Sequence, residues 1–208
     1  MNTVQQTGIT RATLGRLPKY LSFLKSTGTD GYISATAVAK ALNLGEVQVR
    51  KDLNAVSGSG KPKIGYLKKE LIANLESRLG LRALTPAIIA GAGSLGKALL
   101  GFDGFSEYGL EIIAAFDTDP LKIGKKIAGK QILPVSDMRS YCQLNDVKIG
   151  IITVPENSAQ SACDEMLKNG ISAIWSFAPV NLKVPDSVAL RQENLALSLA
   201  HLNLLINQ

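Results

Sequence analysis

The sequence predicts two domains of an α/β protein, a small helical domain at the N-terminus and a larger one built on a parallel sheet. Three observations predict it. Residues 1–85 hold 13 Lys and Arg against 5 Asp and Glu, whereas residues 86–208 hold 10 against 12. The first part shows apolar spacings of three and four, which are typical of helices. The second opens with an apolar run and a glycine-rich turn. We therefore divide the chain at 1–85, 86–190 and 191–208.

Composition limits the classes of protein that fit. Of the 208 residues, 46% are hydrophobic and 19% are charged, which is typical of a globular chain and excludes a disordered one. No apolar run approaches the roughly 18–20 residues of a membrane span, and the N-terminus lacks the apolar core of a signal peptide. We expect a cytoplasmic protein with no metal. Cys142 and Cys163 are far apart, and we expect them to be ordinary buried thiols.

The N-terminal domain reads as three helices. Leucines from Leu14 to Leu24 mark the first, with Pro18 in or near its first turn. Ser34 begins the second because its hydroxyl can accept a helix N–H group. Residues 43–45 form a turn, and a third helix covers 46–56. Two short helices joined by such a turn are a helix-turn-helix.

The third helix is the candidate DNA reader. It carries side chains suited to base edges and phosphates: Gln48, Arg50, Lys51 and Asn54. Its apolar residues are available for packing, namely Val47, Leu53 and Val56. The alternative is a three-helix bundle with a charged face that binds no nucleic acid.

A wing and a connecting helix follow. The segment SGSGKPKIGYL fits a β-hairpin wing, which would lay Lys61 and Lys63 along a phosphate backbone. A leucine at every fourth position then predicts a helix over 66–79, ending at Gly80. Thr85 and the proline after it mark the domain boundary.

The second domain begins with a nucleotide-binding signature. The apolar run 86–91 predicts a strand buried on both faces, and GAGSLG at 91–96 then opens a helix. Gly91 would allow the tight turn, Gly93 the approach of a pyrophosphate, and Gly96 close packing of helix on strand. The pyrophosphate would bind the N–H groups at the helix N-terminus.

An acidic residue indicates which dinucleotide is bound. A second apolar run, 110–116, ends at Asp117, 21 residues past Gly96. A carboxylate there can accept hydrogen bonds from a ribose diol and repel a 2′-phosphate, which favours NAD(H) over NADP(H). The alternative is a sheet whose glycines only tighten a loop.

The alternation of strands and helices continues toward the C-terminus. We expect strands over 147–154 and 171–175, with a helix over 159–168 between them. The residues after these strands would line the crevice of an open α/β sheet, or merely end the strands. They are Thr153, Val154 and Pro155 after the first, and Phe177, Ala178 and Pro179 after the second.

The last helix, 193–205, is rich in leucine and must be buried somewhere. It can pack within its own chain, which is the simpler answer, or it can exchange between two protomers. The single histidine, His201, lies in it and is more easily read as packed or surface-exposed than as catalytic.

Catalytic signals are missing from the sequence. Only 123 residues follow Thr85, which leaves no room for a substrate domain, and no GxSxG or HExxH motif occurs. The dinucleotide therefore reads as a signal, and the chain as a regulator, not an enzyme. Two alternatives stay open: a small NAD-dependent oxidoreductase with a basic appendage, and an NAD-responsive module that binds protein.

The chain resembles the redox-sensing transcriptional repressors of the Rex family along nearly its whole length. The matching segments are RLPKYL at 16–21, VQVRKDL at 47–53, Gly60-Lys61, Gly65-Tyr66, GAGSLG at 91–96, FDTDP at 116–120, TVP at 153–155 and FAP at 177–179. The resemblance implies a homodimer with an N-terminal winged helix, a Rossmann-like NAD-binding domain and a C-terminal helix that is domain-swapped. It implies binding of double-stranded operator DNA when NAD⁺ prevails, and release when NADH accumulates.

The resemblance also assigns site residues. The DNA-binding residues are Arg16, Ser34, Gln48, Arg50, Lys51, Lys61 and Lys63. The cofactor-binding residues are Gly91, Ala92, Gly93, Ser94, Leu95, Gly96, Phe102, Asp117, Thr118, Thr153, Val154, Pro155, Phe177, Ala178 and Pro179.

The chain departs from the family pattern at a few positions. Phe102 stands where relatives commonly have Tyr, Ser22 where Arg is frequent, and Asn194 where Asp is usual. In relatives these positions can form a charged, hydrogen-bonded network near the nicotinamide, and that ion pair cannot form here. In the wing, 54–57 replaces an aromatic-Gly segment, and Pro62-Lys63 stands where Arg-Gly is common.

Overall fold

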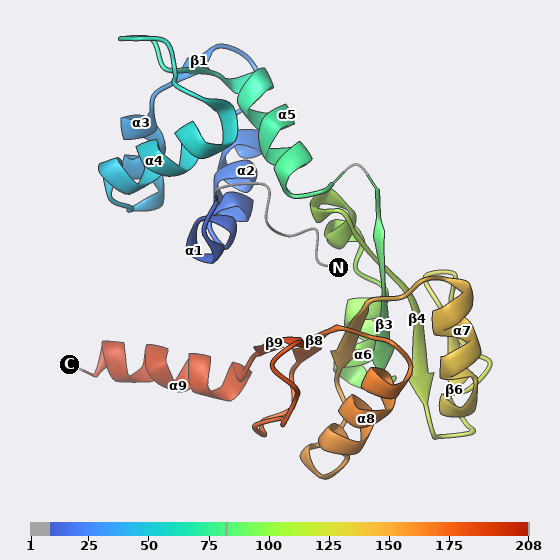
Figure 1. Ribbon diagram of the computed structural model, residues 1–208. Coiled ribbons are helices and arrows are strands. Elements are labelled where there is room, and N and C mark those ends of the chain that lie inside the picture. The colour runs from blue at the N-terminus through green and yellow to red at the C-terminus, as the bar shows by residue number, and fades with distance from the viewer. Residues whose placement is uncertain (1–8, 82, 208) are drawn as a thin grey trace. The chain divides into compact units, whose positions relative to one another are not determined.

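A computed structural model describes residues 9–81 and 83–207 of the chain. The chain separates into two compact units, Met1–Ala83 and Leu84–Gln208, each with its own hydrophobic core (Figure 1). The fold class predicted from the sequence is confirmed: a helical unit with a helix-turn-helix precedes a unit built on a mostly parallel sheet.

The N-terminal unit is a helical bundle with a two-stranded ribbon. Its elements are α1 (Arg11–Leu14), α2 (Leu17–Ser26), β1 (Tyr32–Ile33), α3 (Ala35–Leu42), α4 (Glu46–Ser57), β2 (Tyr66–Leu67) and α5 (Lys68–Arg78). The predicted first helix begins later than expected, at Leu17, with Pro18 in its first turn. Leucines from α2, α4 and α5 that are fully buried form the core.

The helix-turn-helix is α3 and α4. The Ser34 hydroxyl accepts a hydrogen bond from the Ala37 N–H group at 3.1 Å and caps α3 as predicted. Asn43 ends α3 in the left-handed conformation, with φ 51°, and the Leu44 N–H group bonds back to the Ala39 carbonyl. This cap reverses the chain within three residues and lets α4 start at Glu46.

Three predictions in this unit were wrong in detail. Val47 does not pack in the core but is 67% exposed, because the buried side of α4 is formed by Val49, Leu53 and Val56. Tyr66 and Leu67 form a strand paired with β1, so α5 starts two residues later than the leucine spacing predicts. The wing is a tight turn closed by one bridge between Lys61 and Gly65.

The C-terminal unit contains a seven-stranded sheet. Its strands are β3 (Thr85–Ala90), β4 (Leu110–Asp117), β5 (Lys126–Ile127), β6 (Lys130–Pro134), β7 (Ile149–Ile152), β8 (Ala173–Ser176) and β9 (Ala189–Gln192). Their order is β5-β6-β4-β3-β7-β8-β9, and all neighbours are parallel except β5 and β6. Six of them, from β6 to β9, follow the strand order of a doubly wound dinucleotide-binding sheet.

Helices cover both faces of the sheet, which is why its strands read as continuous apolar runs. On one face α7 (Met138–Leu144) and α8 (Glu156–Lys168) pack on Ile88, Phe116 and Ile152. On the other, α6 (Ser94–Leu100) and a 3₁₀ helix, η1 (Asp103–Tyr108), cover Ile89 and Ile132. A second 3₁₀ turn, η2 (Val135–Asp137), leads into α7.

The sequence analysis missed the outer strands β5, β6 and β9, as well as α7. The boundary that we placed at residue 190 falls inside β9, which pairs with β8 through residue 192. Cys142 and Cys163 are buried free thiols, as expected, one on each of the two helices that cover the first face of the sheet.

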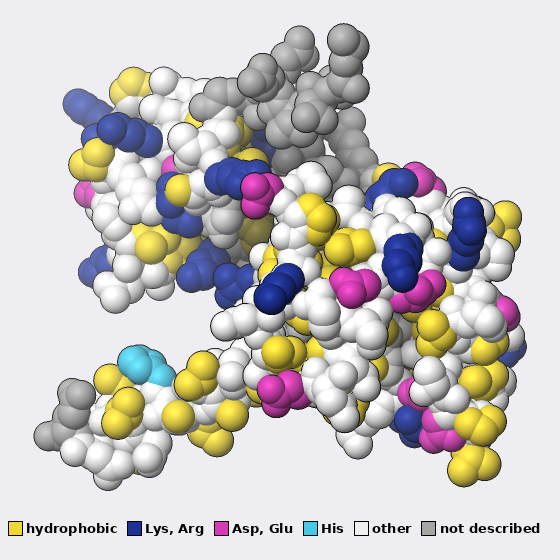
Figure 2. Space-filling model, turned by 60° about the horizontal axis from the view of Figure 1, so that its bottom comes forward, with side chains coloured by type: hydrophobic (Ala, Val, Ile, Leu, Met, Phe, Trp, Pro, Cys, Tyr) yellow, Lys and Arg dark blue, Asp and Glu magenta, His cyan; other side chains and the backbone are white. Residues whose placement is uncertain are grey.

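The last helix, α9 (Leu195–Ile206), exposes its apolar side chains. Leu195, Leu197, Leu199, Leu202, Leu204 and Leu205 are all 54–69% exposed. Figure 2 shows these hydrophobic side chains gathered on the open surface of α9, with the histidine among them. The simpler of the two expectations, packing within its own chain, is therefore not met among the described residues of the unit that α9 belongs to. No helix among the described residues is long and apolar enough to cross a membrane.

Candidate functional site

The glycine turn lies where the strand order of the sheet reverses. β3 and β7 are parallel neighbours. The strand after β3 in sequence, β4, lies on one side of this pair, and the strand after β7, β8, lies on the other. The carboxyl ends of β3 and β7 are followed by Gly91 and Thr153. The Thr153 hydroxyl donates to the Gly91 carbonyl at 2.7 Å, and its N–H group to the Ala90 carbonyl at 2.9 Å. These bonds fix the two strand ends side by side, and ligands of open α/β sheets bind at such a point.

Each of the three signature glycines has a different surrounding. Gly91 has φ 98°, and a Cβ there would meet Val154 Cγ1 at 2.8 Å. A Cβ on Gly96 would overlap the Gly91 carbonyl oxygen, so this glycine brings α6 against β3. At Gly93 a Cβ would meet no atom within 4 Å. The protein leaves that space open, which is what the approach of a pyrophosphate requires.

A cavity of about 830 Å³ opens beside this turn. Seven predicted cofactor residues line it: Gly91, Gly93, Asp117, Thr118, Thr153, Val154 and Pro155. The sequence analysis missed other lining residues, among them Asp119, Lys122, Ser158 and Glu165. Only Lys122 and Asp119 had a signal in the sequence, since both lie in the loop that follows the acidic end of β4.

Asp117 lines this cavity and is buried, with 8% of its surface exposed. Its carboxylate accepts the Ala92 N–H at 2.7 Å, the Asp119 N–H at 2.9 Å and the Lys122 ammonium at 3.0 Å. Burial alone would raise the pKa of Asp117, but these donors outweigh it and hold that pKa below its usual value. The group is thus an anion, and a carboxylate with three donors has room for one more.

The other predicted cofactor residues do not line the cavity: Ala92, Ser94, Leu95, Gly96, Phe102, Phe177, Ala178 and Pro179. Two of them are the ends of a chain of aromatic rings. Phe102, 56% exposed, lies edge-on to Phe105, which touches Trp175, which in turn lies 4.5 Å from Phe177 between ring centres. Phe105, Trp175 and Phe177 pack with the core under α6, on the face of the sheet opposite to α8.

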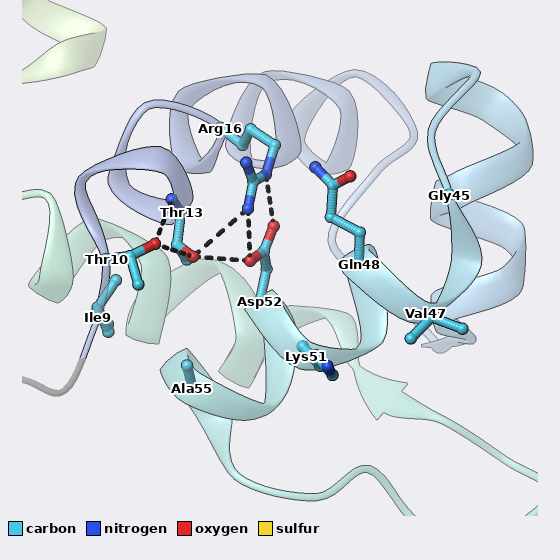
Figure 3. Close-up of a pocket in the computed structure, with 10 residues that line it drawn as sticks. All are labelled: Ile9, Thr10, Thr13, Arg16, Gly45, Val47, Gln48, Lys51, Asp52 and Ala55. Carbon is cyan, nitrogen blue, oxygen red and sulfur yellow. Dashed lines mark hydrogen bonds and ion pairs between the residues drawn. The ribbon is translucent and has the colours of Figure 1, made fainter.

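In the N-terminal unit, the polar side chains of α4 divide between two sides. Gln48 and Lys51 line a cavity of about 610 Å³ together with Arg16 and Asp52 (Figure 3). Arg50 points elsewhere and pairs with Glu46 one turn earlier. Asn54, expected among the DNA-reading set, has its amide oxygen taken by the Tyr66 hydroxyl at 2.6 Å.

Asp52 is the residue that sequence reasoning missed. It is 3% exposed and accepts hydrogen bonds from Thr13 at 2.9 Å, from Tyr20 at 2.7 Å and from both Nε and Nη2 of Arg16 at 2.7 and 2.9 Å. Although burial alone would raise the pKa of Asp52, these donors lower it. Arg16, predicted to contact DNA, is therefore first of all the partner of a buried carboxylate on α4.

The wing presents its two lysines differently. Lys61 lies over the ring of Tyr32, with Nζ 5.4 Å from the ring centre and 3.2 Å from the hydroxyl. Lys63 is exposed at the tip, in the left-handed conformation with φ 63°. Glycine adopts that conformation more readily than lysine does.

In the described part of the chain no group of three or more His, Cys, Asp or Glu side chains could hold a metal ion. The two candidate sites are thus an open glycine turn with an ionised aspartate, and a helix-turn-helix whose reading helix is tied to Arg16.

Comparison with known families matches both units. The family described as "Putative DNA-binding protein N-terminus" matches residues 8–54, and the one described as "CoA binding domain" matches residues 83–180.

Curated relatives match along nearly the whole chain. The redox-sensing transcriptional repressor Rex of Treponema denticola is 42% identical and covers 92% of each chain. That of Bacteroides fragilis is 39% identical and covers 97% of this chain and 91% of its own.

Solved structures give the same result. The crystal structure of RSP in complex with β-NAD⁺ and operator DNA matches with a TM-score of 0.88 and 33% identity, over 97% of this chain and 94% of that one. The complex of RSP with β-NADH matches with a TM-score of 0.85 and 33% identity, over 97% and 96%. RSP is described as a Rex-family repressor.

Proposed function

This chain belongs to the Rex family of redox-sensing transcriptional repressors, and on that premise we propose how its two units divide the work. The N-terminal unit binds operator DNA, and the C-terminal unit holds NAD(H), whose redox state decides whether DNA is kept. The observation that carries this is the open glycine turn at the strand-order reversal, joined in one chain to a basic helix-turn-helix.

The cavity residues fit the dinucleotide. The space that the protein leaves open at Gly93 suits a pyrophosphate, and the remaining acceptor site of Asp117 suits a ribose hydroxyl. The same buried anion repels a 2′-phosphate, which favours NAD(H) over NADP(H). NAD(H) supplies a nicotinamide that is read as oxidised or reduced; the chain binds and positions it and is a regulator, not an enzyme.

The DNA-binding residues that we propose fall into two groups. The first group is Gln48 and Lys51 on α4, which line the cavity in this unit and enter the major groove of the DNA, and Arg16, which orients that helix. The second group binds phosphates. It consists of Ser34 at the start of α3, Arg50 on the other side of α4, and Lys61 and Lys63 in the wing.

The protein acts as a homodimer, and we propose that α9 is the exchanged element. Its exposed leucines need a partner, and exchange between two protomers covers them with a two-fold symmetry that matches a palindromic operator. A protein that works on DNA in this way belongs in the cytoplasm.

The release of DNA follows from a difference between the affinities of two dimer states for NADH. We propose two dimer states that space the two α4 helices differently, with NADH preferring the state that does not fit DNA. Because Phe102, Ser22 and Asn194 cannot form the ion pair that relatives can use, the size of the response in this chain depends on other contacts.

The test is a titration. Fluorescence anisotropy of a labelled operator duplex with bound protein is followed while NADH or NAD⁺ is added. NADH should release the duplex at concentrations at which NAD⁺ leaves it bound. Release of the duplex at equal concentrations of the two nucleotides would rule out the redox switch. If the duplex stays bound with either nucleotide, the protein binds DNA but does not respond to NAD(H).

A further inference from the structure

The Arg16 side chain is held rigidly by α4. Its guanidinium donates two bonds to the Asp52 carboxylate, and only 25% of the side chain is exposed. Thr13 and Tyr20 donate to the same carboxylate, so the group cannot turn away. Forked pairs of this kind fix geometry as well as energy. Arg16 is therefore a fixed point beside the exposed edge of α4.

Gln48 lies directly beside this fixed point (Figure 3). With its amide nitrogen toward Arg16, two donors would face each other. Turned end for end, its oxygen lies 2.8 Å from Arg16 Nε, whose one hydrogen it shares with Asp52, and accepts from Nη1 at 3.3 Å. Because a guanidinium only donates, this second orientation is the favourable one. It leaves the amide NH₂ group facing away from Arg16.

The location of Gln48 makes this orientation matter. It is the third residue of α4, and the N-terminal residues of a recognition helix are those that meet base edges. A free glutamine reads adenine with both ends of its amide, donating to N7 and accepting from N6. With its oxygen held against the guanidinium of Arg16, Gln48 turns the donor end of its amide outward.

We propose that the Asp52–Arg16 pair orients Gln48 so that it reads an acceptor edge, guanine N7 and O6 above all, instead of adenine. Arg16 is then a positioning residue for base recognition, and Gln48 determines specificity at one operator position. The proposal rests on the proposed DNA binding and adds which base is read.

The experiment measures binding of the full-length protein to operator duplexes that carry each of the four base pairs at every position of one half-site. We expect one position at which guanine is preferred over adenine by about fivefold or more, the ordinary range for one good base contact. Gln48→Ala should remove the preference there and nowhere else. Arg16→Ala frees the amide to turn, so the guanine-to-adenine ratio at that position should fall.

A second variant guards against loss of folding, since Arg16→Ala leaves a buried carboxylate without its partner. Gln48→Glu keeps Arg16 and Asp52 paired and replaces the donor with an acceptor. It should move the preference at the same position toward cytosine, whose N4 donates. Arg78→Ala, an exposed arginine on α5, serves as the matched control.

The salt dependence of DNA binding distinguishes a positioning role of Arg16 from a direct contact with a phosphate. If Arg16 contacts a phosphate, Arg16→Ala weakens all duplexes equally and lowers the slope of log K against log salt by about 0.9. That result overturns the proposal, as does an unchanged base preference in Gln48→Ala and Gln48→Glu. Wild-type protein that binds no duplex contradicts the proposed function instead.

Discussion

At the scale of single residues, two glycines of the same turn have different roles: Gly93 is needed for cofactor binding and Gly96 for folding. A side chain on Gly93 meets open space at φ −75°, whereas one on Gly96 meets the Gly91 carbonyl and the Thr153 hydroxyl. We therefore predict that Gly93→Val folds like the wild type but loses NADH binding by at least tenfold. NADH binding is measured by quenching of the single tryptophan, Trp175.

Gly96→Ala is the matched variant. Its Cβ forces α6 away from β3, and overpacking of this kind costs about 1–3 kcal/mol. Thermal unfolding should show the loss in Gly96→Ala and not in Gly93→Val. A Gly93→Val protein that binds NADH normally contradicts the placement of the pyrophosphate at this turn.

Tyr20 gives the second prediction. Burial, and then its hydrogen bond to Asp52, raise the pKa of Tyr20 to about 12. A folded-state pKa above the unfolded value means that the tyrosine contributes its full stability below pH 10, and loses it as the pH rises toward 12. The loss amounts to about 3 kcal/mol, for two pKa units at about 1.36 kcal/mol each.

Urea unfolding between pH 9 and 12 measures this loss. Tyr20→Phe should be less stable than the wild type at pH 9, because Asp52 loses a donor, and the difference should shrink as the pH rises. A difference that stays constant across this range argues against the raised pKa.

What the sequence reveals at this scale depends on local chemistry. Ser34 and Gly96 contact Ala37 and Gly91, which are near neighbours in the chain, and Gly91 is recognised by its own positive φ. The spacing therefore predicts the roles of all three. The pairing of Arg16 with Asp52 joins residues 36 apart. No periodicity indicates such a contact, so the only role predicted for Arg16 was the DNA binding that the family resemblance implies.

At the scale of elements, the wing gives the third prediction. Lys63 holds a left-handed conformation that costs a non-glycine residue about 1–2 kcal/mol. Lys63→Gly removes this strain together with a charge. We expect its stability to equal or exceed that of the wild type, although its salt slope for DNA binding falls by about one.

Lys63→Arg is the control, because it keeps the charge and the strain. Its salt slope should match the wild type in the same titrations of affinity against salt. If Lys63→Gly also keeps the wild-type slope, the tip of the wing does not touch a phosphate.

Element length decides how well the sequence predicts each one. The long apolar strands β3 and β4 and the helix α8 have enough residues to show their period. Two-residue strands such as β1, β2 and β5 do not. The leucine spacing of α5 includes Leu67, so it predicted a helix from Tyr66 onward. In the structure Tyr66 and Leu67 instead pair with β1.

At the scale of the whole molecule, the alternation of strands and helices predicts a parallel sheet but not which strands are neighbours. The right-handed crossover rule limits the choices. It does not say that β3 lies between β4 and β7, which is the arrangement that creates the ligand crevice. The glycine signature with an acidic residue at the end of the next strand indicates a dinucleotide-binding sheet, but we predicted no strand order from it. The order is seen only in the structure.

The last prediction concerns α9 and the dimer. Leu199 and Leu202 are 69% and 57% exposed, and α9 has no packing partner among the described residues of its own unit. In an exchanged helix these two leucines lie in the interface, so Leu199→Asp with Leu202→Asp should turn the dimer into a monomer. Light scattering during size-exclusion chromatography measures the mass.

Leu144→Asp is the matched control, since Leu144 on α7 is 85% exposed without being part of an apolar helix face. It should stay dimeric. The α9 variant should also lose affinity for a two-half-site operator much more than for a single half-site, because only a dimer engages both halves at once. A variant that stays dimeric and binds both duplexes like the wild type places the interface elsewhere, and α9 would then need another partner for its leucines.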